Sequence, residues 1–410
     1  QCDPGIGSDA FYDLVYRKPT MIMLLTSSCS EVAKTLGEIV PYWHLLLISF
    51  AATTPALSKR EKYPTFFRLA AADSSHNQAR KTFIQHFTWN TVATFTQDLE
   101  AFSLAMNEMA TDFEKVNISL RATKSFRPTD DDLKTKMEAL KETDARIIVG
   151  SFKEDVARQV FCEAYRQKMY GPRYVWMLTG GYSHRWWTKP VDGNCTRQQL
   201  ATAIDGYFSV ESLNKIIGSR TSISGLTTSA FLEAYDELGV KDARSAYAQV
   251  TYDTVWSVAL TLKKTMQFWK QRNMNLSLSN FTYYEGQGMM NTFFKIMGSL
   301  EFMGVSGPVS FEGPDRRCIT AFRQFQDGRE EMVAIFFPEN NTLDFKCHGC
   351  KPVIWKGGKL PADKYTILIR QELIHREAFF IVCAVSIFGI ILALFFLGFN
   401  LYHRKLNMCI

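Results

Sequence analysis

Two cysteines in the C-terminal part of this sequence stand at a spacing that is typical of metal sites and of redox-active disulfides. Cys347-His348-Gly349-Cys350 is a C-x-x-C pattern, which in the cytosol would suggest a zinc site or thiol–disulfide exchange. No second pair of metal ligands lies nearby, and outside the cell the same pattern favours a disulfide. The seven histidines are scattered, and the chain has no G-x-S-x-G and no phosphate-binding loop. We therefore expect no catalytic residue, no metal site and no cofactor.

Ser30 is a second candidate, because its hydroxyl stands where a helix begins. It follows Cys29 and precedes apolar residues at helical spacing, Val32, Leu36, Ile39 and Val40. As an N-cap, Ser30 would lie where free backbone N–H groups and the helix dipole favour a carboxylate or a phosphate. It can equally cap the helix without binding a ligand, and the residues alone leave both interpretations open.

Length and composition exclude several classes of protein. At ~150 residues per domain, 410 residues form two or three domains. Subtracting 41 acidic from 47 basic residues leaves a net charge of +6. This charge is spread thinly, whereas a nucleic-acid binder needs a dense basic patch. A content of 46% hydrophobic and 13% aromatic residues excludes a disordered chain.

The last part of the chain has the length and composition of a membrane span. Residues 378–401 contain no charged side chain, and a helix rising ~1.5 Å per residue would cross the ~30 Å hydrocarbon layer. His403, Arg404 and Lys405 follow, so the positive-inside rule predicts a cytoplasmic tail at residues 402–410. We expect a plasma-membrane protein whose N-terminal region is extracellular.

Sequons and cysteines agree with this orientation. Asn-x-Ser/Thr sequons that precede the span predict glycosylation at Asn117, Asn194, Asn275, Asn280 and Asn340. Of nine cysteines, Cys383 lies in the span and Cys409 in the tail. The other seven are an odd number, which implies one free or intermolecular thiol, and the pairing of Cys318 stays open.

Short apolar runs alternate with helical patterns in the region before the span. The runs that predict strands are residues 21–25, 45–49, 92–95, 147–150 and 174–178. Helical spacing is clear between Leu99 and Val116, and again between Val156 and Met169. Such alternation predicts parallel sheets with right-handed crossovers, which is an α/β doubly wound fold. The length suits two lobes with a binding cleft between them.

Several groups of residues resemble the metabotropic GABA-B receptors, which are class C G-protein-coupled receptors. These groups occur in the family's order along the whole chain, at 49–58, 63–68, 144–150, 160–165, 252–256 and 304–311. Within the family, Ser49–Pro55, Thr94–Asp98 and Phe325–Arg329 are most similar to the type 2 subunits of invertebrates.

The resemblance implies a bilobed Venus-flytrap ectodomain of the periplasmic-binding-protein-like type I class at residues 1–345. Lobe 1 would comprise about 1–83 and 211–303, and lobe 2 about 84–210 and 304–345. A stalk at residues 346–377 would lead to the span, and residues 365–369 within it predict a strand. Compared with the family, the chain begins after the first strand and helix of lobe 1 and ends after the first transmembrane helix. It also begins with Gln1 and not Met, so we expect part of a longer protein.

The family's agonist pocket holds a carboxylate with hydroxyl groups and an ammonium with an acid and aromatic faces. Ser30 and Thr53 match the two hydroxyl positions. The remaining positions depart from the family: Ala70 replaces a histidine, Lys153 a tyrosine, Gly181 a tryptophan and Tyr247 a glutamate. An ammonium buried without its carboxylate loses roughly 2 to 5 kcal/mol. We therefore expect this degenerate pocket not to hold GABA.

The resemblance also implies disulfides. Family cysteines match the pairs Cys2–Cys29 and Cys162–Cys195, and Cys347–Cys350 is a third candidate pair.

A helix around residues 9–16 would carry Phe11, Tyr12, Val15 and Tyr16 on one face. Periodicity alone favours a core face there. The resemblance instead places Tyr12 and Tyr16, with Phe11, at a subunit interface.

The function that the resemblance implies is that of a type 2 subunit and not an enzyme. Such a subunit binds no agonist, pairs with a GABA-B type 1 subunit, supports surface delivery and couples to a heterotrimeric G protein through the full-length receptor. Two alternatives stay open. One is the ectodomain of an enzyme-linked receptor of the guanylyl cyclase type, and the other is a truncated single-span decoy.

Overall fold

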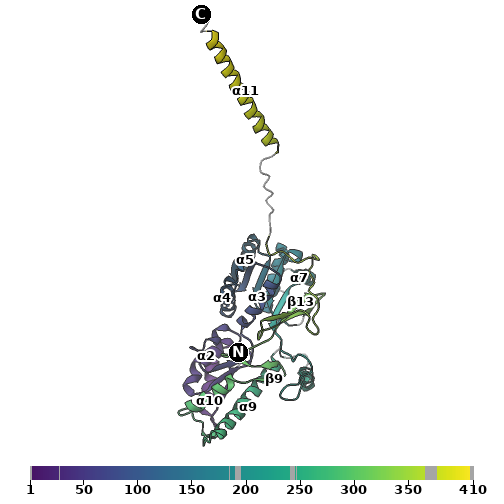
Figure 1. Cartoon of the computed structure of the whole chain (residues 1–410). Coiled ribbons are helices and arrows are strands. Elements are labelled where there is room, and N and C mark those ends of the chain that lie inside the picture. Colours follow the sequence, from purple (N-terminus) through teal and green to yellow (C-terminus); the bar gives the residue numbers. More distant parts are fainter. Residues whose placement is uncertain are drawn as a thin grey trace. The chain divides into compact units, whose positions relative to one another are not determined.

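The structure is a computed structural model, and it describes residues 2–26, 28–183, 185–189, 195–240, 245, 247–364 and 376–406. The chain divides into two compact units, residues 1–364 and residues 365–410 (Figure 1). The first unit contains two lobes, each built on its own sheet. The second contains one long helix.

The first lobe is built on a five-stranded sheet in the order β1-β2-β3-β12-β11. Its strands are β1 (Met23–Thr26), β2 (Leu46–Ser49), β3 (Phe66–Arg68), β11 (Phe311–Glu312) and β12 (Asp315–Arg316). Its helices are α1 (Pro4–Tyr16), α2 (Ser30–Ile39), α8 (Thr228–Tyr235), α9 (Ala248–Gln271) and α10 (Gln287–Gly298). β1, β2 and β3 are parallel, and every residue of β2 is buried, as expected for a parallel strand covered on both faces. A short hairpin of β9 (Phe302–Gly304) and β10 (Gly307–Val309) precedes β11.

The second lobe is built on an eight-stranded sheet in the order β15-β14-β13-β8-β7-β6-β4-β5. Its strands are β4 (Thr91–Gln97), β5 (Ser119–Phe126), β6 (Ile147–Ser151), β7 (Val175–Thr179), β8 (Phe208–Ser212), β13 (Thr320–Gln326), β14 (Arg329–Phe337) and β15 (Thr342–Asp344). Its helices are α3 (Asn77–His86), α4 (Glu100–Glu114), α5 (Asp130–Glu142), α6 (Glu154–Gln167) and α7 (Arg197–Ile204). One apolar core joins the sheet to α3 and α4, and another joins it to α5, α6 and α7. Helices therefore cover both faces, and the expected α/β doubly wound, bilobed fold is confirmed.

The two sheets place the lobe boundaries differently from the expectation. β11 and β12 extend the first sheet, so the chain returns to the second lobe after Arg316 and not at residue 304. α3 packs in the second lobe through Ala79 and Phe83, so the first crossing lies before residue 77 and not at residue 83. Strands of two residues have no hydrophobic period, which is why the sequence did not reveal β11 and β12.

The segment of residues 346–364 lies against the second lobe and is not a free stalk. The indole Nε1 of Trp89 donates to the carbonyl of Pro361 at 2.9 Å. Asp363 accepts hydrogen bonds from the backbone N–H groups of Asn90 and Thr91 at 2.7 and 2.8 Å. Trp355 packs against the core that contains α3 and α4. We call residues 346–364 the strap; the predicted strand at 365–369 lies outside the described residues.

The C-terminal unit holds α11 (Arg376–Leu406). Its stretch Ala378–Lys405 is long and apolar enough to cross a membrane, and it contains the predicted span at residues 378–401. The last turn of this helix contains His403, Arg404 and Lys405. The first residues of the predicted tail at 402–410 are therefore helical.

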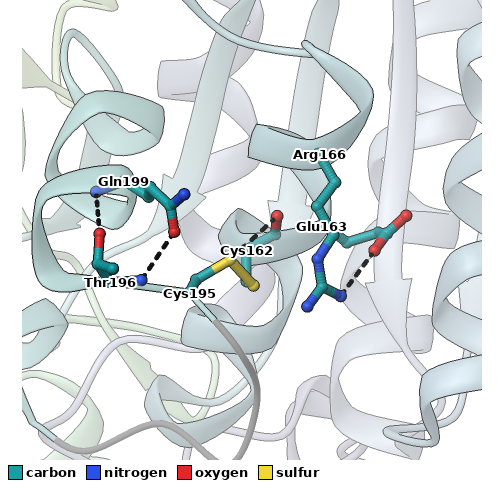
Figure 2. Close-up of a disulfide and its surroundings, with 6 residues drawn as sticks. All are labelled: Cys162, Glu163, Arg166, Cys195, Thr196 and Gln199. Carbon is teal, nitrogen blue, oxygen red and sulfur yellow. Dashed lines mark hydrogen bonds and ion pairs between the residues drawn. A yellow bond between two sulfur atoms is a disulfide. The ribbon is translucent and has the colours of Figure 1, made fainter.

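Disulfides join the same three cysteine pairs that the sequence suggested. Cys2–Cys29 connects the start of α1 to the start of α2, and Cys347–Cys350 closes a loop in the strap. Figure 2 shows Cys162 in α6 bonded to Cys195, which precedes α7. The next residue begins a capping box: Thr196 Oγ1 accepts from the N–H of Gln199, whose side chain accepts from the N–H of Thr196 (Figure 2).

Candidate ligand-binding cleft

A cleft of about 830 Å³ opens between the two sheets of the first unit. The first lobe contributes residues that follow β2 and β3, among them Thr53 and Ala70, and residues at the start of α9. The second lobe contributes Gly180 and Gly181 after β7, and the end of β8 with the segment beyond it. The cleft therefore lies at the carboxyl ends of parallel strands, where α/β sheets bind ligands.

Arg68 fixes the loop that carries Thr53. This guanidinium is fully buried at the end of β3, and its Nη1 donates to the carbonyls of Ala52 and Thr54, each at 2.8 Å. Its Nε pairs with Asp315 at 2.5 Å. Because the carbonyls on both sides of Thr53 are anchored, the Thr53 side chain is presented to the cleft by a rigid loop.

Asp73 gives the cleft a carboxyl group close to Thr53. The backbone N–H of Asp73 donates to the carbonyl of Thr53 at 2.9 Å. Burial raises the pKa of Asp73 to about 6, although Arg68, a hydrogen bond with Thr53 and Arg80 each act to lower it. Above that pH, the cleft contains a carboxylate within electrostatic reach of two arginines.

The charged side chains that β8, the segment after it and β13 contribute to the cleft include Glu211, Lys215 and Arg323. Arg323 Nε pairs with Glu211 Oε1 at 2.6 Å, so this carboxylate is already engaged. Burial lowers the pKa of Lys215, and the nearby Arg323 lowers it further. Gly180 permits the close approach of β8, because a Cβ there would lie 2.5 Å from the Cβ of Glu211.

His76 connects two of the segments that cross between the lobes. Its Nδ1 lies 2.9 Å from Thr320 Oγ1, the first residue of β13. Burial, with a smaller contribution from Arg80, lowers the pKa of His76 to about 3, so the imidazole stays neutral. Arg80 is also buried and donates to Asn77 Oδ1 at 2.9 Å. His76 also lines the cleft, as Asp73 does. We call the segments that cross between the two lobes, one of which contains His76, the hinge.

The structure brings four of the predicted pocket residues together and leaves two apart. Thr53, Ala70, Gly181 and Tyr247 all line the cleft.

Ser30 and Lys153 are not among the residues that line the cleft. The N-cap of α2 is Cys29 and not Ser30, which is the first helical residue; its Oγ accepts from the N–H of Thr54 at 3.4 Å. Lys153 caps α6, and its N–H donates to Gln97 Oε1 at 3.0 Å.

Charged residues of the cleft were missed because no short motif marks them. Glu211 lies in β8 and Arg323 in β13, and the pairing of these strands brings the two side chains together. Asp73 begins a short 3-10 helix and Lys215 lies beyond the end of β8. Glu211 and Arg323 lie in strands that also contain Ser, Thr and Gln, so no change in hydropathy marks them in the sequence. Among the described residues, no cluster of three His, Cys, Asp or Glu side chains could hold a metal ion.

The predicted interface residues separate into two groups on α1. Phe11 is 2% exposed and belongs to the core of the first lobe, so its assignment to an interface is wrong. Tyr12 and Tyr16 are 41% and 78% exposed. An aromatic face is therefore open on this helix, with the ring of Tyr16 edge-on to Trp43 at 6.3 Å.

The sequons that the structure describes are on its surface. Side chains are exposed at Asn117, Asn275, Asn280 and Asn340, and Asn194 lies outside the described residues. Exposure is what glycosylation at these four positions would require.

Known proteins resemble the chain over nearly its full length. Residues 1–321 match the family described as "Receptor family ligand binding region". Gamma-aminobutyric acid type B receptor subunit 2 of Homo sapiens is 32% identical, over 99% of this chain and 43% of that protein. Subunit 1 of Mus musculus is 31% identical, over 99% and 42%. Subunit 2 of Caenorhabditis elegans is 26% identical, over 98% and 46%. The chain thus spans less than half the length of these relatives, and its identity to the two subunit types is nearly equal.

Proposed function

We propose a function from the premise that this chain belongs to the receptor family ligand binding region family and is homologous to GABA-B receptor subunits 1 and 2. The protein is a subunit of a GABA-B-type receptor in the plasma membrane and not an enzyme. Its two-lobed unit is extracellular, which three disulfides and four exposed sequons support. The basic last turn of α11 supports a cytoplasmic C-terminal end.

Within such a receptor, the chain has the type 2 role of a partner that does not bind the agonist. The observation that carries this proposal is the composition of the cleft. Ala70, Gly181 and Tyr247 line it. At these positions the resemblance expects a histidine, a tryptophan and a glutamate, and none of the three residues present carries a negative charge. An amino-acid agonist would therefore lack the ionic partner that its ammonium needs.

The carboxylates that do line the cleft are poor partners for an ammonium. Glu211 is paired with Arg323. Asp73 lies within electrostatic reach of Arg68 and Arg80, whose positive charges oppose a cationic ligand. Agonist binding would then belong to a type 1 partner in a heterodimer, and coupling to a heterotrimeric G protein would belong to the full-length receptor.

Calorimetry tests this assignment. The full chain in detergent, titrated with gamma-aminobutyric acid up to millimolar concentration, should give no saturable heat. A type 1 subunit titrated under the same conditions is the positive control. Saturable heat at micromolar ligand would assign agonist binding to this chain and refute the type 2 role. Co-purification with a type 1 subunit from the same membrane separately tests the heterodimer.

A further inference from the structure

The C-x-x-C loop at the start of the strap has no part in the proposed function. Cys347 and Cys350 are disulfide-bonded and only three residues apart in sequence. The loop follows β15, and the backbone N–H of Lys351, directly after it, donates to the carbonyl of Met332 in β14 at 2.7 Å. The disulfide is thus fixed on the edge of the eight-stranded sheet.

The disulfide is accessible to an attacking thiol. His348 and Gly349, between the two cysteines, are exposed, and the cysteines themselves are only half-buried. Cys162 of the disulfide in Figure 2 is 3% exposed and belongs to an apolar core, whereas its partner Cys195 is half-buried and Cys2 of the Cys2–Cys29 disulfide is exposed. An incoming thiolate must reach a sulfur atom, and both strap cysteines meet this condition; their preference over the other two disulfides rests on the flanking lysines and on the short loop that their disulfide closes.

Two lysines flank the C-x-x-C loop in the sequence. Lys346 precedes Cys347, His348 follows it, and Lys351 follows Cys350; all three side chains are exposed. The nearest acid in the chain, Asp344, accepts a hydrogen bond from the backbone N–H of Lys346 at 2.7 Å. Cations beside a cysteine stabilise its thiolate, and a stabilised thiolate is the better leaving group when the disulfide is attacked.

The fold can tolerate the loss of this disulfide. In the chain-entropy account, a disulfide contributes more to stability when it closes a longer loop. Cys347–Cys350 spans 3 residues, whereas Cys2–Cys29 spans 27 and Cys162–Cys195 spans 33. Reduction in the strap would therefore free one short loop and leave the helices and sheets in place.

The same disulfide lies beside the hinge between the lobes. Both cysteines pack against a small apolar cluster made by Leu213, Ala321, Met332 and Ile335, with Ile319 at its edge. Two of the segments that connect the lobes lie side by side there, one after β8 and one before β13. The N–H of Leu213 in the first donates to the carbonyl of Ile319 in the second at 2.8 Å. Leu213 also lines the cleft.

We propose that Cys347 and Cys350 form a thiol–disulfide exchange site, which an extracellular dithiol oxidoreductase reduces and reoxidises and whose state sets the stiffness of the interlobe hinge. In reduction, a thiolate of the dithiol attacks one sulfur and forms a mixed disulfide, and the other cysteine leaves as a thiolate. The second thiol of the reductant then attacks the mixed disulfide. The reductant leaves as a disulfide, and the chain holds two thiols, having gained two electrons and two protons.

Differential alkylation of the full chain in detergent tests the exchange site. The protein is equilibrated with increasing dithiothreitol or reduced thioredoxin, blocked with N-ethylmaleimide and mapped by peptide mass spectrometry. Cys347 and Cys350 should be labelled at a dithiol concentration at least about tenfold below that needed for Cys162 and Cys195.

Charge-neutral variants provide the matched comparison. Lys346→Gln combined with Lys351→Gln should slow labelling of the strap cysteines several-fold and leave labelling of Cys162 unchanged. Labelling of both pairs at the same dithiol concentration would overturn the proposal. A peptide in which Cys318 is bonded to Cys347 or Cys350 would also overturn it.

Hydrogen exchange tests the effect on the hinge. Peptides that contain Leu213 and Ile319 should exchange faster in the reduced protein and in the double variant Cys347→Ser with Cys350→Ser. A peptide of the buried β2 strand serves as the control for global unfolding and should not change. Equal exchange of the hinge peptides in both redox states would overturn the hinge effect, whatever the outcome of agonist calorimetry.

Discussion

At the scale of single residues, Asp73 shows how the cleft sets the behaviour of a carboxyl group. An unfolded chain leaves this carboxyl near its ordinary pKa of 3.8, whereas burial in the fold raises the pKa to about 6. The folded protein therefore binds the Asp73 proton more tightly than the unfolded chain does. The contribution of Asp73 to stability is complete below pH 3.8 and is lost as the pH rises through about 6.

Replacing Asp73 by Asn should remove this pH dependence, because the amide resembles the protonated acid. Relative to the wild type, Asp73→Asn should gain about 2 kcal/mol between pH 4 and pH 7. Thermal melts of both proteins across that range measure the difference. A constant difference between Asp73→Asn and the wild type across that range would contradict the perturbed carboxyl.

Thr53 and Ala70 were predicted from the family resemblance, and both line the cleft. The strand before Thr53 was also predicted from its apolar run, whereas the three-residue strand β3 before Ala70 was not. The sequence could not separate Phe11 from Tyr12, because adjacent helical positions share an apolar stripe and only packing against Trp43 and the core decides which ring is buried. The prediction that Ser30 is the N-cap of α2 was wrong by one position, because the N-cap is Cys29.

At the scale of elements, buried parallel strands were the easiest to predict. β2 and β6 are continuous apolar runs, and the predicted bounds differ from the observed ones by one residue at most. The sequence predicts a short stalk at residues 346–377, because Pro and Gly residues there indicate loop. The attachment of the strap depends on Trp89, more than 250 residues away in the chain, which donates to Pro361. Contacts at that separation leave no local pattern.

The strap should therefore depend on Trp355. Its ring packs edge-on to Phe87 and Trp89 at centroid distances of 5.2 and 5.9 Å. Trp355→Ala should cost about 2 kcal/mol of local stability and speed tryptic cleavage after Lys356.

The control for this prediction is Ile354→Ala, since that neighbouring side chain is 47% exposed and should leave the cleavage rate unchanged. Equal cleavage rates for Trp355→Ala and the wild type would show that the ring does not hold the strap in place.

At the scale of the whole molecule, the proposed role requires a surface that a partner subunit can cover. α1 has one face in the core, through Phe11 and Val15, and another that exposes Tyr12 and Tyr16. Tyrosine suits such a surface because its ring buries a large area on association while its hydroxyl keeps a hydrogen-bonding partner. The exposed aromatic face of α1 is therefore the candidate contact with a type 1 subunit.

Truncation of these rings should separate assembly from folding. Tyr12→Ala should weaken association with a type 1 subunit by about 1 kcal/mol or more, which is roughly fivefold in Kd, with little change in melting temperature. Phe11→Ala is the matched variant one residue away, and because that ring is fully buried it should cost about 3 kcal/mol of stability. Biolayer interferometry on the folded fraction and thermal melts measure the two effects. If Tyr12→Ala lowers the melting temperature as Phe11→Ala does and leaves Kd unchanged, the subunit contact lies on another face.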